Sequence, residues 1–584
     1  MFHLLLTFHS PLSRPSLCFT TRCPTTSVPP VLSSPVFCPR WSLTRLHLCR
    51  LSQLLLPLSL TLSLPTAHVV SGPARSPFSG GAPVFPPEVL EDKQFELGFL
   101  AAAVPHLCAM LLAPEGDPDA LDIPIPRTHA EAISGPWASY WIAAEEVDMA
   151  SYRSTGTYVD AVPPPGMNVV SGRWLYKVKR SPGSPLVFKA RYVARGFSQR
   201  EGVDFFQTFA PTPKMSTLRV LLHIAAQRDY ELHSLDFSTA FLQGSLHEQI
   251  WLRRLPGFTG SFPPGTQWQL RRPVNGLRQA PREWHDTLRS TLAALDFFPS
   301  SAEPSLFVRR GSTPFFVLVY VDDLVFATPD QRALASVKEE LLRRHTCTNL
   351  GELQHYLGLQ IIRDSPARTI TLTQSHMVEQ ILKRFRFPFS KVQLTLLGVD
   401  HGLMAPPLDE PFESSGPYPE LVGCLMYLMT CTRPDLAYPL SVLARFVAPG
   451  RHQPSHWYAA KRVAKYVAST SGMGLVLGGK QPVTLTGYSD SSWANDAETH
   501  RSTQGYSFSL EAGAVLWRST RASSVAGSSC EAEVYAAAIA AQELRWLSFL
   551  LTDLDIFTKA LPPCDHQRFC TQLGLVPARP HLLT

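Results

Sequence analysis

The stretch Phe315-Phe-Val-Leu-Val-Tyr-Val-Asp-Asp-Leu-Val-Phe-Ala327 decides the fold. Two runs of apolar, β-prone residues flank a pair of acids, which predicts a tight hairpin with Asp322 and Asp323 at its turn. Strands that are apolar at every position are expected to be buried on both faces, unlike the strands beside an ordinary Asp-containing turn. Two like charges at such a turn need a cationic partner, and a pair of divalent cations is what phosphoryl transfer requires. The stretch therefore predicts a two-metal site.

A second acid in a similar setting lies upstream, in the stretch Leu232-His-Ser-Leu-Asp-Phe-Ser-Thr-Ala-Phe241. Two-metal sites need carboxylates from separate strands, so Asp236 is the candidate partner of Asp322. The alternative is that Asp236 is the N-cap of a helix that begins after it, since Asp is common at that position. The local pattern alone leaves both interpretations open.

The segment from Arg173 to Arg200 carries eight basic residues and no acid. Its interleaved aromatic residues are Trp174, Tyr176, Phe188, Tyr192 and Phe197. A basic hairpin with interleaved aromatic rings is typical of contact with phosphates and nucleobases. The alternative is a solvated pair of strands in which the Lys and Arg stems lie along the surface.

The composition is that of a globular protein. The 584 residues are enough for three or four domains, and 45% of them are hydrophobic and 17% charged. These values exclude wholesale disorder and a multi-span membrane protein. The net charge of +6 comes from residues 1–87, which hold six Arg and no Lys, Asp or Glu. The rest of the chain is formally neutral, so the global charge predicts no partner.

The first 90 residues are rich in Ser, Pro, Thr and Leu and have no sustained helical or strand period. They are similar either to an organelle transit peptide or to translated non-coding sequence, and the scattered Pro favours the second. The apolar run 54–64 is too short to span a bilayer and nothing later is longer, so we expect no membrane contact. The eleven Cys match neither a zinc site nor a disulfide framework. They indicate free thiols in a reducing compartment, and we expect the cytoplasm or nucleus.

Several further stretches carry a family resemblance. In chain order they are Lys189-Ala-Arg-Tyr-Val-Ala-Arg-Gly-Phe-Ser-Gln199, Glu201-Gly-Val-Asp-Phe-Phe-Gln-Thr-Phe-Ala-Pro211, Leu235-Asp-Phe-Ser-Thr-Ala-Phe-Leu242, Gly276-Leu-Arg-Gln-Ala-Pro-Arg282 with Trp284, Tyr320-Val-Asp-Asp-Leu324, and Leu350-Gly-Glu-Leu-Gln-His-Tyr-Leu-Gly358. In order and spacing they resemble the reverse transcriptase of copia-type retrotransposon polyproteins and the ribonuclease H that follows it. The resemblance covers about residues 130–560.

The resemblance implies roles for residues of the active site. Asp236 and Asp322 would hold two metal ions, Mg²⁺ or Mn²⁺, and Asp323 would complete the acidic cluster. Phe241 falls where the family keeps an aromatic ring beneath the incoming sugar, which would exclude a 2′-hydroxyl; the alternative is a core Phe. Gln279 would line the nucleotide pocket.

The resemblance also implies the fold class, which is α+β. We expect a right-hand polymerase fold with fingers, palm and thumb, followed by a truncated ribonuclease H-like α/β domain. In the fingers, Arg191 and Lys189 would neutralise the triphosphate. The helical period of Gln374 to Phe385 is placed in the thumb. The expected segments are a low-complexity, disordered or non-native leader (1–125), fingers and palm (130–375), thumb and connection (376–483), the truncated nuclease-like domain (484–561) and a tail (562–584).

Near the C-terminal end, the stretch Thr486-Gly-Tyr-Ser-Asp-Ser-Ser-Trp-Ala494 resembles the first strand of a ribonuclease H fold, with Asp490 as its first metal-binding acid. Glu531 would be the second, although Ser528 and Glu531 also form a capping box by their spacing. The resemblance places the block with Asp555, the expected fourth carboxylate, several dozen residues further on, which implies that the intervening strand with the third acid is missing here. We therefore expect ribonuclease H activity to be lost.

Two function classes follow from this sequence. The first is an RNA-directed DNA polymerase that acts on an RNA template, a DNA primer, an RNA–DNA hybrid and deoxynucleoside triphosphates by two-metal nucleotidyl transfer. The second is a catalytically dead retrotransposon remnant that at most binds nucleic acid. The intact acids favour the first class, and the truncated nuclease and the unusual leader favour the second. The sequence predicts no particular oligomeric state.

Overall fold

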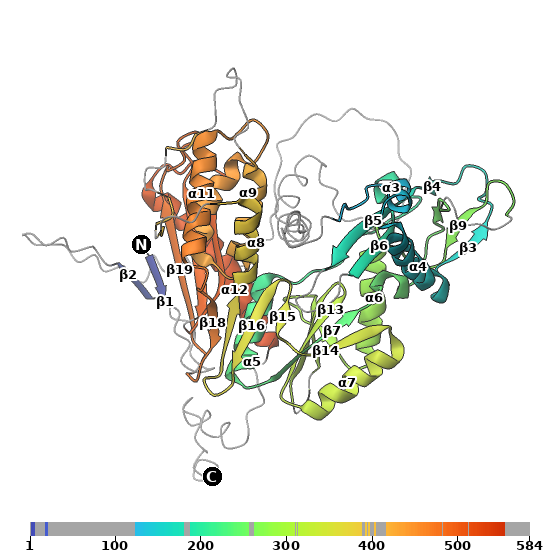
Figure 1. Ribbon diagram of the computed structural model, residues 1–584. Coiled ribbons are helices and arrows are strands. Elements are labelled where there is room, and N and C mark those ends of the chain that lie inside the picture. The colour runs from blue at the N-terminus through green and yellow to red at the C-terminus, as the bar shows by residue number, and fades with distance from the viewer. Residues whose placement is uncertain are drawn as a thin grey trace, which may run out of the picture. The chain divides into compact units, whose positions relative to one another are not determined.

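The computed structural model describes residues 2–5, 18–21 and 123–554, except for short gaps at 180–186, 256–261, 310, 312, 388–391, 394, 398–401, 405–415, 482 and 512. All of the described residues fall in one compact unit of the chain. They form both helices and strands, which matches the expected α+β content (Figure 1). In this part of the chain no helix is both long enough and apolar enough to cross a bilayer. Among the cysteines whose side chains the structure describes, Cys347, Cys424, Cys431 and Cys530 form no disulfide bond.

The predicted hairpin forms the centre of a six-stranded antiparallel sheet. The strands are, in spatial order, β10 (Phe298–Pro299), β11 (Leu306–Arg309), β12 (Phe315–Tyr320), β13 (Asp323–Thr328), β7 (Glu231–Phe237) and β14 (Cys347–Glu352). Strands β12 and β13 pair from Phe316 opposite Ala327 to Tyr320 opposite Asp323. The hairpin prediction is therefore confirmed, with the two acids at its turn.

Helices cover both faces of this sheet, which explains why its central strands are apolar at every position. They are α5 (Met215–Gln227) on one face, and α6 (Ala280–Ala293) and α7 (Gln331–Arg344) on the other. Phe316 and Leu318 pack in the core that contains α5, whereas Phe315 and Val317 pack in the core that contains α6 and α7. Successive residues of a strand point to opposite faces, so both sets are removed from water. Each such side chain contributes about 1.5–3 kcal/mol relative to exposure.

A separate core lies in the N-terminal part of the described chain. Its elements are α3 (His129–Ser134), α4 (Ala138–Ser154), the two-stranded sheet β5 (Gly172–Lys179) and β6 (Val187–Ala194), and the four-stranded sheet of β3 (Tyr158–Ala161), β9 (Gln267–Leu270), β8 (Trp251–Leu252) and β4 (Val169–Val170). Helix α4 packs against β6, and the ring of Trp141 meets that of Tyr176 edge-on. This module lies in the part of the chain, about residues 130–375, that we expect to form fingers and palm.

A third group of elements follows the six-stranded sheet in the chain. It contains the strands β15 (His355–Tyr356), β16 (Leu359–Asp364), β17 (Thr369–Thr373) and β18 (Leu475–Gly478), and the helices α8 (Ser375–Phe385), α9 (Tyr418–Cys431), α10 (Ala437–Leu443) and α11 (Pro454–Ser469). Short 3-10 turns lie at Gly196–Ser198, Ala240–Gln243, Pro434–Leu436 and Ala444–Phe446. Helix α8 confirms the helical period predicted for this segment, and its residues Met377, Val378 and Ile381 are buried.

The C-terminal elements form a five-stranded sheet covered by one long helix. The sheet order is β2 (Cys18–Thr21), β1 (Phe2–Leu5), β19 (Leu485–Ser492), β20 (Thr503–Leu510) and β21 (Gly513–Arg521), and the helix is α12 (Ser529–Asp553). Strands β1 and β2 belong to the leader, in which the sequence shows no sustained strand period, and β1 pairs antiparallel with β19. The rest of the leader and the expected tail lie outside the described residues.

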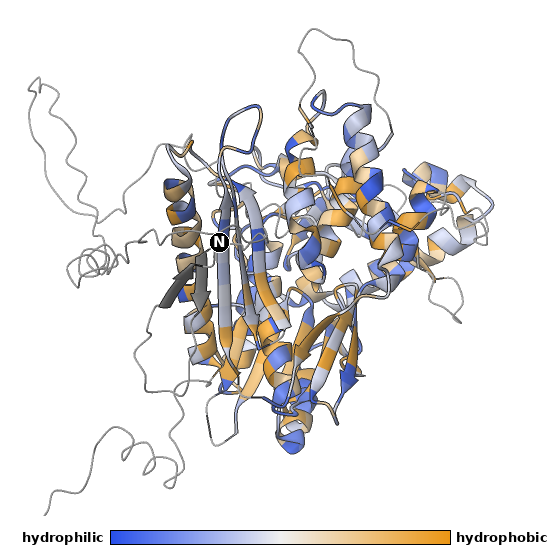
Figure 2. Cartoon of the chain, turned by 90° about the vertical axis from the view of Figure 1, so that its left-hand side faces the viewer, coloured by the Kyte–Doolittle hydropathy of each residue, from blue (hydrophilic) through white to orange (hydrophobic). Residues whose placement is uncertain are grey.

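One hydrophobic core crosses the expected boundaries near residues 376 and 484. It contains buried residues of α5, of the sheet β15–β18, of the helices α8 to α11, and of β20, β21 and α12. Figure 2 shows hydrophobic residues on both the strands and the helices of this region. The polymerase-like and nuclease-like segments therefore share their interior.

Arg219 of α5 lies at the centre of this shared core, with 4% of its surface exposed. Its Nε donates to the carbonyl of Val515 in β21 at 2.8 Å, and its Nη1 donates to the carbonyls of Thr430 and Cys431 at 2.7 and 3.0 Å. The guanidinium also lies 3.9 Å from the ring centre of Trp517. Burial lowers the pKa of Arg219 to about 9. Arg219 thus joins the central sheet's helix to both α9 and the C-terminal sheet.

Replacing Arg219 by Met is expected to lower the free energy of unfolding by about 2–4 kcal/mol, because three buried carbonyl oxygens would lose their donor. Urea unfolding of the full chain measures this as a lower midpoint at an unchanged m-value. Arg289→Met, on the exposed side of α6, is the matched control and is expected to change stability by less than about 0.5 kcal/mol. Equal stability of the two variants would contradict the role of Arg219.

Candidate active site

The three predicted acids meet at one end of the six-stranded sheet. Asp323 is the first residue of β13 and pairs directly with Asp236 of β7. Asp322 lies in the turn, and its carbonyl accepts a hydrogen bond of 2.8 Å from the backbone N–H of Phe237. Asp236 lies inside strand β7, so the alternative that it is the N-cap of a helix is wrong. The pairing of two acid-bearing strands brings the cluster together.

The cluster is electrostatically strained. Burial, together with the charges of Asp322 and Asp236, raises the pKa of Asp323 to about 7. Burial and the charges of Asp323 and Asp322 also raise the pKa values of the Tyr320 and Tyr356 hydroxyls. Carboxylate oxygens are the ligands that Mg²⁺ prefers, so the donors fit a divalent cation in type. Across the described residues, however, no group of three or more His, Cys, Asp or Glu side chains is already arranged as a metal-ligand set.

The turn between the strands has an unusual backbone that Trp284 supports. Val321 has a φ of +55°, a left-handed conformation that costs a β-branched residue about 1–3 kcal/mol. The indole Nε1 of Trp284 in α6 donates to the carbonyl of Val321 at 2.7 Å. The Trp284 ring lies 4.9 Å from that of Phe237, the neighbour of Asp236. Trp284 therefore connects the turn to both acid-bearing strands, a role that the sequence did not reveal.

Phe241 lies in the 3-10 turn that follows β7 and is partly buried. It packs against the core of the N-terminal module and against the core that contains α6 and α7. Its position five residues after Asp236 is compatible with a ring near the incoming sugar and with a core Phe, so both interpretations remain.

Gln279 does not line an open pocket. It precedes α6, is fully buried, and its Nε2 donates to the carbonyl of Asp204 at 2.8 Å. Its Oε1 accepts a hydrogen bond of 2.9 Å from Gln199. Both ends of the amide are engaged within the protein, so in this structure Gln279 anchors the segment around residues 199–204 to the start of α6.

Arg191 and Lys189 lie on β6 of the N-terminal module. Arg191 pairs with Leu175 and Lys189 pairs with Lys177 across the hairpin. Both cations lower the pKa of Asp148, although burial raises it overall to about 6. The structure thus places the two cations on the hairpin β5–β6 and not on the sheet that carries the acids.

The predicted nuclease residues are only partly brought together. Asp490 is exposed in the middle of β19. Glu531 is partly exposed in the first turn of α12, where it accepts from the N–H of Gly527 at 2.7 Å and from the Tyr535 hydroxyl, and its own N–H donates to Ser528. The carboxylate near Asp490 is that of Glu533, whose pKa is raised by burial and by the charge of Asp490. Ser528 is the N-cap of α12, as the spacing predicted, but the Glu531 carboxylate accepts from the N–H of Gly527, so the reciprocal bond of a capping box to the Ser528 N–H is replaced by one to Gly527.

Glu531 was predicted because it matches a motif of the family. Glu533 was missed because no motif marks it, and which residues of α12 face Asp490 depends on how the helix packs on the sheet. Asp555 lies outside the described residues.

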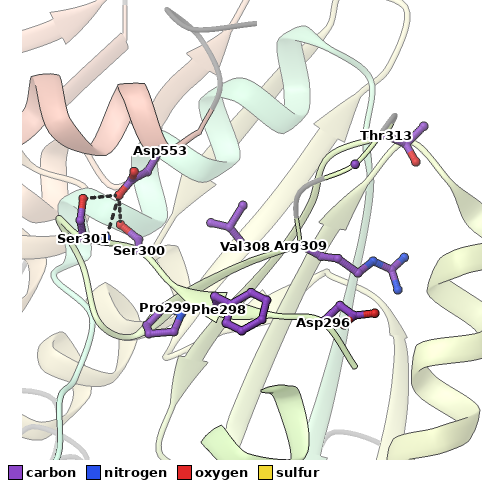
Figure 3. Close-up of a pocket in the computed structure, with 10 residues that line it drawn as sticks. Asp296, Phe298, Pro299, Ser300, Ser301, Val308, Arg309, Thr313 and Asp553 are labelled. Carbon is purple, nitrogen blue, oxygen red and sulfur yellow. Dashed lines mark hydrogen bonds between the residues drawn. The ribbon is translucent and has the colours of Figure 1, made fainter. Parts of the chain in front are cut away.

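A cavity of about 890 Å³ lies beside the C-terminal end of α12 (Figure 3). Its lining residues are Asp296, Phe298, Pro299, Ser300, Ser301, Val308, Arg309, Gly311, Thr313 and Asp553. The Asp553 carboxylate accepts from the Ser300 hydroxyl at 2.6 Å, from the hydroxyl and N–H of Ser301 at 3.0 and 2.8 Å, and from the N–H of Ala302 at 3.3 Å. Burial disfavours the ionised carboxylate, but these hydrogen bonds outweigh it and lower the pKa of Asp553. Asp553 therefore fixes the helix end to the sheet, and none of the predicted catalytic acids lines this cavity.

The hairpin with Asp322 and Asp323 at its turn and the neighbouring strand with Asp236 bring three carboxylates to one end of a sheet, an arrangement that suits the two-metal sites of the polymerase class. Residues 156–394 match the family described as reverse transcriptase (RNA-dependent DNA polymerase). The transposon Ty5-1 protein of Saccharomyces cerevisiae is 30% identical over 292 residues, which cover 49% of this chain and 92% of that protein. The chain belongs to the reverse transcriptase family of copia-type transposon polyproteins.

Longer relatives match over more of the chain. The retrovirus-related Pol polyprotein from transposon TNT 1-94 of Nicotiana tabacum is 34% identical over 76% of this chain and 34% of its own length. That from transposon RE1 of Arabidopsis thaliana is 34% identical over 74% of this chain and 29% of its own length. The chain thus spans about a third of these polyproteins.

Among solved structures, a foamy viral protease-reverse transcriptase in complex with double-stranded DNA aligns with 75% of this chain and 65% of its own chain. It has a TM-score of 0.37 and 13% identity, which is too weak a likeness to support an inference.

Asp323→Asn is expected to be more stable than the wild type at pH 8 by about 1–2 kcal/mol when divalent cations are chelated, and equally stable at pH 4. The pKa of Asp323 is higher in the folded protein, about 7, than its usual 3.8, so the folded state loses stability as the pH rises through this interval. Partial solvent screening keeps the effect below the full shift. Thermal unfolding in EDTA at the two pH values measures it, with the exposed Asp286→Asn as control. A difference in stability between Asp323→Asn and the wild type that is the same at pH 4 and at pH 8 would contradict the inferred repulsion among the three carboxylates.

Proposed function

We propose that this chain is an RNA-directed DNA polymerase that extends a DNA primer along an RNA template with deoxynucleoside triphosphates. The observation that carries the proposal is the direct pairing of Asp323 with Asp236, with Asp322 in the adjoining turn. Family membership supports the same reaction class. In the proposed reaction, the primer 3′-hydroxyl oxygen forms a bond to the α-phosphorus, the bond to pyrophosphate breaks, and the hydroxyl proton passes to solvent.

Asp236, Asp322 and Asp323 would hold the divalent cations, Mg²⁺ or Mn²⁺. When bound, these ions would stabilise the negative charge that develops on the phosphoryl oxygens. The raised pKa of Asp323 supports this assignment, because a nearby cation would relieve the repulsion among the three carboxylates. Trp284 would keep the turn in its left-handed conformation, so that both acids of the hairpin stay at the end of the sheet.

Other residues would select and hold the substrates. Phe241 would favour deoxynucleotides if its ring lies beneath the sugar, because a 2′-hydroxyl would then collide with it. Arg191 and Lys189 would contribute positive charge for the triphosphate or for the nucleic-acid backbone. Gln279 would act indirectly in the state described above, since it holds the segment around Gln199 and Asp204 against the start of α6.

A second candidate is a catalytically dead remnant that at most binds nucleic acid. The observation that favours it concerns the expected nuclease acids: the Glu531 carboxylate is bonded to the N–H of Gly527 at the start of α12, and the strand with the third acid is missing from the sequence. All three expected acids of the polymerase site are present at one end of the sheet, so we favour the polymerase over the dead remnant.

Primer extension on an RNA template with Mg²⁺ and deoxynucleotides is expected for the full chain, and Asp322→Asn and Asp323→Asn should each reduce its rate at least about 100-fold, because a metal-binding charge is lost. The full chain is needed because the core of the polymerase part extends to α12. Asp286→Asn, an exposed carboxylate of α6, is the control and should keep the rate. Failure of the folded wild type to extend any primer would leave the remnant as the better explanation.

We further propose that ribonuclease H activity is lost, since the third acid's strand is missing from the sequence. The purified full chain should leave the RNA strand of an RNA–DNA hybrid intact in Mg²⁺ or Mn²⁺. Asp490→Asn and Glu533→Gln should give the same intact strand on gel electrophoresis. Cleavage by the wild type that Asp490→Asn abolishes would overturn this proposal.

A further inference from the structure

One buried hydroxyl near the three acids has no hydrogen-bond partner in the structure. Tyr356 of β15 is 5% exposed. Its Oη is shielded from water and lies beyond hydrogen-bond reach of every residue that the structure describes. Buried polar atoms in native proteins are nearly always paired, and an unpaired one points to a partner that the protein gains when it works.

The Tyr356 hydroxyl and the acids lie on the same side of the six-stranded sheet. Tyr320 is directly opposite Asp323, and Asp323 is directly opposite Asp236, so these three side chains share one face. Two positions further along β13, Val325 packs in the core that contains α5. Tyr356 is buried in that same core, and Tyr320 packs against it. The core therefore brings the hydroxyl to the face that carries Asp323.

Electrostatics place the hydroxyl close to the Asp323 carboxylate. The charges of Asp323 and Asp322 add to burial in raising the pKa of Tyr356, so its hydroxyl stays protonated and can donate. Burial and the neighbouring carboxylates raise the pKa of Asp323, and no hydrogen bond from a described residue offsets them. At Asp553, by contrast, hydrogen bonds outweigh burial and lower the pKa. Asp323 thus lacks a donor, and Tyr356 is an unused one.

Helix α9 fixes the backbone beside Tyr356. The hydroxyl of Tyr427 in this helix donates to the carbonyl of Leu357, the residue that follows Tyr356. The carbonyl of Cys431, at the end of the same helix, accepts from the buried Arg219. Tyr356 is therefore held by the same contacts that join α5, α9 and the C-terminal sheet.

We propose that Tyr356 is a positioning residue for Asp323. Its hydroxyl donates a hydrogen bond to the Asp323 carboxylate, directly or through one water molecule, and turns this carboxylate towards a bound divalent cation. The inference rests on the polymerase proposed above, whose metal ions the three acids would hold. The bond is not formed in the structure, so the proposal concerns the state in which a cation holds Asp323. Hydrogen bonds to charged acceptors are strong, and donors that orient a metal ligand raise metal affinity.

The test is the binding of Mn²⁺ to the full chain, measured by electron paramagnetic resonance without nucleic acid or nucleotides. Tyr356→Phe is expected to raise the Kd for Mn²⁺ about tenfold, because the ligand carboxylate loses its orienting donor. The matched control is Tyr418→Phe, since Tyr418 is fully buried in the same core and donates to the carbonyl of Leu443 at 2.7 Å. This control should keep the wild-type Kd, and an unchanged Kd in Tyr356→Phe would overturn the proposal.

Urea unfolding in EDTA separates positioning from a structural role. Phe keeps the ring of Tyr356 and removes only an unpaired hydroxyl, so Tyr356→Phe should unfold at the wild-type midpoint or above it. Tyr418→Phe should unfold at a lower midpoint, because it loses a buried hydrogen bond. A lower midpoint for Tyr356→Phe would show that its hydroxyl stabilises the fold without a metal, and would overturn the proposal.

A double-mutant cycle identifies the partner of the hydroxyl. In the Asp323→Asn background, Tyr356→Phe should change the Kd for Mn²⁺ by less than about twofold, because the charged acceptor is already absent. An effect of about tenfold that persists in this background would overturn Asp323 as the partner.

Primer extension distinguishes this proposal from the proposed function. Tyr356→Phe should need about tenfold more Mg²⁺ for half of its maximal rate, and saturating Mg²⁺ should restore the rate to within about threefold of the wild type. Primer extension by the wild type, with the same Mg²⁺ dependence and the same Mn²⁺ Kd in Tyr356→Phe, would overturn the positioning role and leave the polymerase standing. A Kd for Mn²⁺ that depends on Tyr356 in a chain that extends no primer would support the positioning role and overturn the polymerase instead.

Discussion

The buried guanidinium of Arg219 is the contact on which the arrangement of the chain depends. Its partners are three backbone carbonyls and an indole ring, contributed by the end of α9 and by β21. Burying a guanidinium costs free energy, which its hydrogen bonds offset here because they satisfy buried carbonyl oxygens that would otherwise have no donor. Because those groups belong to different segments, α5, α9 and the C-terminal sheet must assemble together or leave their polar atoms unpaired.

Helix α5 connects the segments that Arg219 joins to the strands that carry the three acids. Phe316, Leu318 and Val325 of the hairpin β12–β13 pack in the core that contains α5, and the opposite face of the hairpin packs against α6 and α7. A hairpin enclosed from both sides can hold a strained residue such as Val321 and a set of mutually repelling carboxylates. The energy that keeps the acids together thus comes from apolar burial, much of it provided by segments far along the chain.

The hairpin with the two acids and its partner strand could be predicted from the residues that directly flank the acids in the sequence. Unbroken apolar runs beside Asp322 and Asp323 predict a hairpin buried on both faces, and the same context around Asp236 predicts its partner strand. The burial of Gln279 and the hydrogen bond from Trp284 to Val321 depend on which segments meet in space, and no spacing in the sequence contains that information. The basic hairpin shows the difference clearly. Its composition indicates nucleic-acid contact, but only the structure reveals that Lys177 and Lys189 pair on one face, whereas the rings of Trp174, Tyr176 and Tyr192 on the other face are buried.

The shared core also gives the C-terminal sheet a part in the fold that does not depend on its acids. Asp490 is exposed and Glu531 is partly exposed at the start of α12. Leu510, Val515 and Leu547, in contrast, are fully buried in the core that also supports the hairpin β12–β13. Replacing one of them by Ala would cost about 2–5 kcal/mol, a large part of the stability of a typical protein. The C-terminal sheet must therefore keep its apolar interior for as long as the hairpin with Asp322 and Asp323 is to remain folded, whatever happens to the acids on its surface.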